Sequence, residues 1–110
     1  MVDDRISISK VVGLRVSDIY GMYVLTSDGE NVGEVLDVLI DINSWILMKL
    51  ILKPSPKVAK EFGLKKRFRG VKPIEIGVDV VKSVQDVIML SVSSNEFRRM
   101  LKRQFLGETS

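Results

Sequence analysis

This 110-residue chain contains no cysteine and no histidine, and these two absences remove most catalytic and metal-binding chemistry. Without cysteine there is no disulfide, no thiolate metal site and no cysteine nucleophile. Without histidine the chain lacks the commonest general base and the commonest transition-metal ligand. Enzyme activity would have to rest on lysine, aspartate, glutamate, serine or tyrosine alone, and no arrangement of these residues demands it. We therefore predict a protein that is not an enzyme and that uses no cofactor.

Long apolar runs and phosphate-binding motifs are also lacking. No stretch approaches the ~18 consecutive apolar residues that indicate a membrane helix. The acidic start MVDDR does not resemble a signal peptide, and neither GxGxxG nor GxxxxGK[ST] occurs. With only 3 prolines and 45% hydrophobic residues, the chain should form one ordered domain. We expect a cytoplasmic protein with no transmembrane segment.

Five carboxylates in the first half could be mistaken for a metal or acid–base site: Asp28, Glu30, Glu34, Asp37 and Asp41. Calcium loops need oxygen ligands at regular spacing with a glycine at a fixed place, and DGENVGE does not match that pattern. We favour a structural interpretation, in which Asp28 and Glu30 form a turn, Asp41 ends a strand and Glu34 faces solvent. No metal site is predicted.

The stretch from Tyr20 to Lys53 has three β-prone runs separated by two turn signals. The Asp28-Gly29 pair between apolar runs is typical of a hairpin, since a type I′ turn needs positive φ at both central residues. We expect three strands here, at residues 22–26, 31–41 and 45–53. Gly33 predicts a bulge or tight bend. The third strand, WILMKLILK, is so apolar that we expect both of its faces to be covered.

The remaining elements are predicted from caps and breakers. A single helical turn should precede the first strand, at residues 16–21. Ser55 as N-cap and Pro56 at the first helical position predict a short helix near 55–62, ending at Gly63. Ser93 and Glu96 form a capping box that starts a C-terminal helix. Three further strands are expected near 71–76, 78–84 and 87–92.

The C-terminal helix should be strongly amphipathic. Its apolar arc either packs on the open end of a barrel or meets a second protein. Together with the apolar third strand, it gives more apolar surface than a small six-stranded barrel should need, so we predict a dimer. The predicted partner-binding residues are Trp45, Leu47, Phe97, Met100, Leu101 and Phe105.

Charge divides the chain into an acidic and a basic half. Residues 1–50 carry four basic and eight acidic residues, a net of −4, whereas residues 51–110 carry thirteen basic and six acidic residues, a net of +7. Such polarity favours an acidic partner, nucleic acid, an anionic membrane or the acidic half of another copy. A candidate anion or nucleic-acid patch comprises Lys65, Lys66, Arg67, Arg69, Arg98, Arg99, Lys102 and Arg103. Phe68 could stack on a base; the alternative is a solvated loop and helix face, with Phe68 tucked under the loop.

Two hairpin motifs resemble those of the PRC-barrel domain family. The first is Ile19-Tyr20-Gly21-Met22-Tyr23-Val24 followed by Asp28-Gly29-Glu30-x-Val32-Gly33-x-Val35-x-Asp37-Val38 and Ile40-Asp41. The second is Val78-Asp79-Val80-Val81-Lys82-Ser83-Val84-Gln85-Asp86-Val87-Ile88-Met89-Leu90, in which Gln85 stands where the family often has glycine. The resemblance covers roughly residues 14–92.

The resemblance implies a mainly β fold: a small, partly open six-stranded antiparallel β-barrel without catalytic residues. The domain organisation would be an N-terminal arm at 1–12, the barrel at 13–92, and a C-terminal helix and tail at 93–110. The arm is either a short edge strand or a loose extension.

Members of the family act as interaction modules. This chain is most similar to the stand-alone archaeal type, some of which are linked to cell division. They join the assembly of tubulin-like FtsZ and its membrane anchor SepF, and they pair with themselves or with a paralogue. The resemblance thus implies an adaptor recruited to the division site. Because another branch of the family serves ribosome maturation, an RNA- or ribosome-associated role of the basic half is the alternative.

Overall fold

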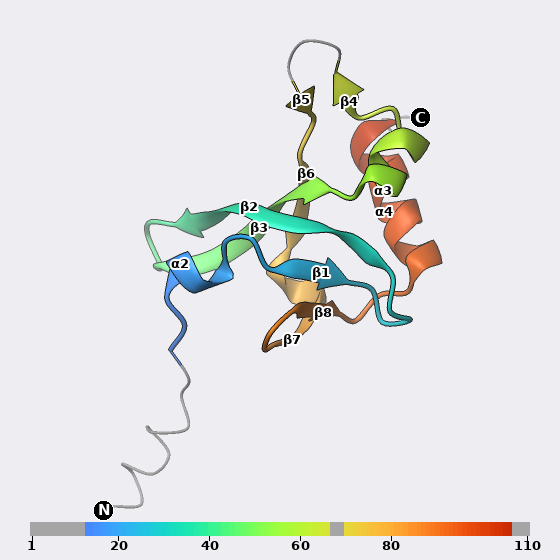
Figure 1. Cartoon of the computed structure of the whole chain (residues 1–110). Coiled ribbons are helices and arrows are strands. Elements are labelled where there is room, and N and C mark those ends of the chain that lie inside the picture. Colours follow the sequence, from blue (N-terminus) through green and yellow to red (C-terminus); the bar gives the residue numbers. More distant parts are fainter. Residues whose placement is uncertain (1–12, 67–69, 107–110) are drawn as a thin grey trace, which may run out of the picture.

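The structure is a computed structural model that describes residues 13–66 and 70–106 (Figure 1). The predicted arm at 1–12 and the last four residues lie outside the described part. The described elements are, in chain order, α2 (Val16–Ile19), β1 (Tyr23–Leu25), β2 (Asn31–Asp41), β3 (Ile46–Pro54), α3 (Pro56–Glu61), β4 (Lys65–Lys66), β5 (Gly70–Val71), β6 (Ile74–Gly77), the 3-10 turn η1 (Val78–Val80), β7 (Val81–Val84), β8 (Ile88–Leu90) and α4 (Ser94–Phe105). The predicted mainly β fold with two later helices is confirmed.

Six of the strands form one sheet in the order β6-β3-β2-β1-β8-β7. Because β6 and β7 are its two edges, the sheet curls without closing, as expected for a partly open barrel. The prediction that every pair is antiparallel is wrong for β1 and β8, which are parallel. Both strands must end on the same side, since the chain leaving β8 binds the turn after β1: the Ser27 amide donates to the Val92 carbonyl at 2.8 Å.

Strand boundaries in the second half also differ from the prediction. The strand expected at 71–76 is divided into β5 and β6, with Lys72 and Pro73 between them. Proline cannot donate to a sheet ladder, which explains the break. The strand expected at 78–84 begins instead with η1. The caps were predicted correctly: the Ser55 hydroxyl accepts from the Val58 amide at 3.2 Å, and the capping box of α4 is complete.

Gly33 allows β2 and β3 to approach closely. A Cβ atom at this position would lie 2.3 Å from the carbonyl oxygen of Lys53, so only glycine fits. Between the pairs Val24–Gly33 and Leu25–Asn31 the register of β1 and β2 shifts by one residue. The predicted irregularity at Gly33 is therefore present, and it bends the sheet where the long hairpin begins.

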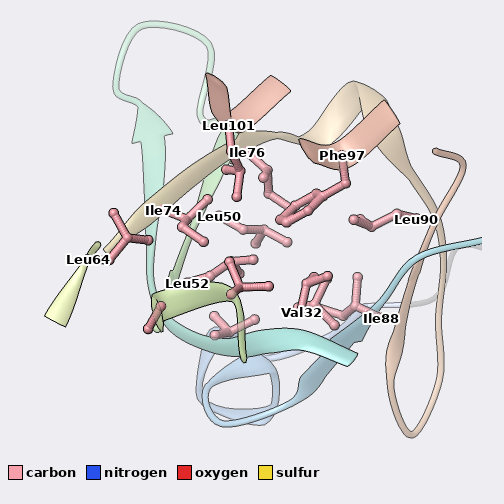
Figure 2. Close-up of a cluster of buried hydrophobic side chains, with 14 of the residues drawn as sticks. Val32, Leu50, Leu52, Leu64, Ile74, Ile76, Ile88, Leu90, Phe97 and Leu101 are labelled. Atoms are coloured by element: carbon pink, nitrogen blue, oxygen red, sulfur yellow. The ribbon is translucent and has the colours of Figure 1, made fainter. Parts of the chain in front are cut away.

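The core lies between the concave face of the sheet and helices α3 and α4 (Figure 2). Phe97 and Leu101 of α4 are fully buried there, while Met100 and Phe105 are partly buried against the same cluster. This corrects the prediction that Phe97 and Leu101 bind a partner. An open barrel needs a cover for its exposed core, and the apolar stripe of α4 supplies it within the same chain.

The expectation that both faces of β3 are covered is also wrong for the described residues. Leu50 and Leu52 point into the core, whereas Lys49 and Lys53 lie on the outer face of the strand. The Lys49 ammonium pairs there with the Glu75 carboxylate at 3.1 Å, with both side chains about half exposed. The apolar character of β3 reflects a buried inner face and, at its start, an exposed end of the hairpin.

Candidate interaction surface

The turn between β2 and β3 exposes a group of large apolar side chains, here named the apolar tip: Leu39, Ile42, Trp45, Ile46 and Met48. The exposed fractions are 77% for Trp45, 73% for Ile42 and 61% for Ile46. Apolar side chains scattered singly on a surface are ordinary, but a cluster at one protruding end marks a binding surface.

The backbone of the turn fixes the direction of Trp45. The Asn43 amide donates to the Asp41 carboxylate at 2.9 Å, and the Trp45 amide donates to the Asp41 carbonyl at 2.6 Å. These bonds close a tight loop in which Trp45 has a φ of 60°. Among the described residues, no other residue except glycine has a positive φ. The left-handed conformation costs an L-residue about 1 kcal/mol, and glycine or asparagine would occupy it more favourably.

The opposite end of the same hairpin forms a groove of about 670 Å³ between the start of β2, the end of β3 and helix α3. Its lining is mostly apolar, from Pro54, Ala59 and Val71 among others. Three cations also line it, Lys53, Lys60 and Lys65, against the single carboxylate of Glu34. We name this feature the basic groove.

A polar network joins the β1–β2 turn to α4. The Arg98 guanidinium donates to the two carboxylate oxygens of Glu30 at 2.7 and 2.8 Å, and to those of Glu61 at 2.6 and 3.0 Å. The hydrogen bonds from Arg98 lower the pKa of Glu30 to about 2 and hold the pKa of Glu61 below its usual value. The pKa of Arg98 is raised by the same bonds. Arg98 supplies one positive charge against these two carboxylates, and the Lys57 ammonium, 3.9 Å from the Glu30 carboxylate, supplies the second. The network holds α4 against the barrel.

The same turn is anchored by Asp28. Its carboxylate accepts from the buried Thr26 hydroxyl at 2.7 Å, and from the Ser94 amide and hydroxyl at 3.0 Å each. The bond from Thr26 is the main reason that the pKa of Asp28 is lowered. Asp28 and Glu30 therefore have the structural role predicted for them. In the described ranges, no three carboxylates gather closely enough to hold a metal ion.

The comparisons with known proteins agree with this architecture. The family model of the PRC-barrel domain matches residues 11–96, which is most of the chain. The chain belongs to the PRC-barrel domain family. PRC-barrel domains are generally non-enzymatic modules that mediate protein interactions. Among curated proteins, a sequence search finds no match. None of the helices that the structure describes in this PRC-barrel is long and apolar enough to cross a membrane.

The predicted partner-binding residues of this PRC-barrel lie in two places. Trp45 belongs to the apolar tip, and Leu47, two residues further along, is half-buried against the core. The four α4 residues face the barrel instead. The sequence interpretation missed Ile42 and Ile46, which are more exposed than Leu47. Two large apolar residues, Ile42 and Trp45, on either side of the polar turn residues Asn43-Ser44 could have indicated the tip.

The predicted anion patch is dispersed over several elements. Lys65 lines the basic groove and Lys66 follows it in β4, while Arg67 and Arg69 lie outside the described residues. Arg98 is held by Glu30 and Glu61. The other three cations, on the exposed side of α4, are Arg99, Lys102 and Arg103; their side chains are solvent-accessible.

Proposed function

We propose that this PRC-barrel is a protein-interaction module that docks through its apolar tip, and that it serves as a dimeric adaptor in the archaeal FtsZ–SepF division assembly. The exposed side chain of Trp45 carries the proposal. It is held at positive φ on a turn where folding would favour glycine or asparagine. A tryptophan retained at such a position is best explained by what it binds.

The chemistry of the tip suits a docking element. Tryptophan dominates binding energy at protein interfaces, because one rigid side chain buries a large area at low entropic cost. Ile42 and Ile46 flank Trp45 within four residues of the chain, and both are largely exposed, so they add apolar surface to the same turn. The two hydrogen bonds from Asn43 and Trp45 to Asp41 stiffen the loop before any partner binds, and preorganisation of this kind improves affinity.

The assignment to cell division rests on the resemblance to the stand-alone archaeal PRC-barrel proteins. An adaptor needs a surface for its partner and a surface for its own copy. The apolar tip provides at least one of these, whereas the stripe of α4 is already used inside the barrel.

Direct binding measurements with purified archaeal FtsZ and SepF test the proposal. We expect one of the two to bind the wild type, and binding to fall at least tenfold in Trp45→Ser. Leu106→Ser is the matched control, since Leu106 is 66% exposed but lies at the end of α4. Recovery of ribosomal proteins or RNA from native lysate, with no division protein, would overturn the division role.

A second candidate function, RNA association, is favoured by the three exposed cations of α4. Binding through phosphates should weaken steeply as salt rises. A titration of generic RNA across salt concentration therefore tests it, comparing the wild type with the charge reversal Arg99→Glu/Arg103→Glu. Absence of binding at low salt removes this candidate.

A further inference from the structure

The apolar tip and the basic groove lie at opposite ends of one β-hairpin. Strands β2 and β3 pair from Gly33 and Pro54, beside the groove, to Asp41 and Ile46, beside the tip. At a rise of about 3.4 Å per residue, the eight steps along β2 separate the two ends by roughly 27 Å. Figure 1 shows the turn of this hairpin on one side of the molecule and α3 on the other. A chain therefore cannot place its own tip in its own groove.

The two surfaces are complementary in polarity and charge. The groove combines an apolar lining with Lys53, Lys60 and Lys65. The tip presents Trp45 and its apolar neighbours. The segment from Leu36 to Met48, which carries the tip, has two acidic residues, Asp37 and Asp41, and no lysine or arginine. Lys49, the next residue, is paired with Glu75 at 3.1 Å. Opposite charges around an apolar contact fix its orientation and speed association.

The groove is also large enough for this occupant. Pockets that bury a small ligand typically measure about 300–1,000 Å³, and the groove, at about 670 Å³, falls within that range. An aromatic side chain such as Trp45 buries roughly 150–250 Å² when it is enclosed. A second copy of this chain supplies a rigid turn that presents the indole at its end.

We propose that the apolar tip of one copy docks in the basic groove of a second copy, so that the chains associate head to tail. The inference rests on the proposed function insofar as it uses the same tip, and it makes the proposed dimer the first step of a head-to-tail association with further copies of this chain. Because the two contact surfaces differ, each added copy leaves one tip and one groove free. Such heterologous contacts build rings when the rotation closes and open filaments when it does not.

Two surface variants separate the two halves of the contact. Trp45→Ser removes the tip, whereas Lys53→Glu/Lys60→Glu reverses the charge of the groove at two exposed positions. The charge-matched control is Lys82→Glu/Lys102→Glu, which changes exposed lysines on β7 and α4. Circular dichroism and thermal unfolding verify that each variant remains folded.

Light scattering across a concentration series then measures the mass of each protein and tests whether the chains associate through these two surfaces. We expect the wild type and the charge-matched control to grow in mass beyond two chains, and the tip and groove variants each to remain monomeric. An equimolar mixture of the tip and groove variants should regain the mass of two chains and no more, because one intact tip meets one intact groove. A mixture that stays monomeric, or a wild type that is monomeric at every concentration, would overturn the proposal.

The outcome is distinguishable from failure of the division role. The groove variant retains the tip, so it should still bind the division partner when offered it as a monomer. If the mixture pairs but neither FtsZ nor SepF binds, self-association stands and the division role fails. If FtsZ or SepF binds and the mixture of variants does not pair, the division role stands and self-association through the tip and groove fails.

Discussion

Arg98 on α4 and Glu30 in the turn before β2 form a two-pronged ion pair, with nitrogen–oxygen distances of 2.7 and 2.8 Å. Both side chains are largely shielded, with exposed fractions of 17% for Arg98 and 20% for Glu30. The pair joins residues 68 positions apart in the chain and fastens the helix that closes the open barrel. It is thus a structural element of the fold, and it makes the free energy of unfolding depend on pH in the acid range.

The first prediction concerns acid stability. The pKa of Glu30 is lowered from 4.5 to about 2 in the folded state by the hydrogen bonds from Arg98. A lowered folded pKa adds stability that is complete above the unfolded pKa and is lost as pH falls through the folded value. We expect Glu30→Gln to lower the free energy of unfolding at pH 7 by about 1–2 kcal/mol, allowing for solvent screening.

Urea unfolding at several pH values measures this effect. The stability of the wild type should decline between about pH 5 and pH 2, and the decline should be shallower in Glu30→Gln. Part of the slope will remain, since the pKa of Glu61 is lowered by the same guanidinium. Equal slopes in the two proteins would contradict the structural role of the pair.

The second prediction concerns Gly33. In Gly33→Ala the new Cβ atom would lie 2.3 Å from the carbonyl oxygen of Lys53, and this neighbour is backbone that cannot move aside cheaply. We expect a loss of about 2–4 kcal/mol in the free energy of unfolding. Gly13→Ala is the control, because no atom lies within 4 Å of its added Cβ. Similar stabilities of both variants would show that β2 and β3 do not approach as described.

The third prediction separates stability from binding at Trp45. Asparagine tolerates the left-handed conformation better than tryptophan, and the 77% exposed indole contributes little packing. We expect Trp45→Asn to raise the free energy of unfolding by about 0.5–1 kcal/mol while abolishing association. Chemical unfolding followed by circular dichroism, together with light scattering, measures both quantities. A variant that is less stable than the wild type would mean that Trp45 is retained for packing.

Much of the fold is predictable from local chemistry. The proline-led α3 and the capping box of α4 depend on a few neighbouring residues, and each appears where expected. The turn at Asp28-Gly29 is also present, but the predicted type I′ geometry is wrong, because Gly29 has a positive φ and Asp28 does not. The parallel pairing of β1 and β8 was not predictable in the same way. It follows from contacts between residues 66 positions apart, such as Ser94 with Asp28, and the sequence order of two short strands does not reveal them.

The interaction surface was harder to predict because amphipathicity does not state what covers an apolar face. Phe97 and Leu101 have the spacing of a partner-binding stripe, yet their own barrel covers them. Exposure at Ile42 depends on how far the hairpin extends past the sheet, which hydrophobic periodicity does not report. The basic groove brings Lys53 of β3 together with Lys65 of β4, and only the folded chain shows that they line one hollow.

The emission of Trp45 tests the central claim most directly. It is the only tryptophan in the chain, so emission excited selectively at tryptophan, without the two tyrosines, reports on the apolar tip alone. As the protein concentration rises, we predict that the emission shifts to shorter wavelength and that acrylamide quenches it less, and that neither change occurs in Lys53→Glu/Lys60→Glu. Emission typical of a solvent-exposed indole at every concentration, including those at which light scattering detects association, would contradict docking through the tip.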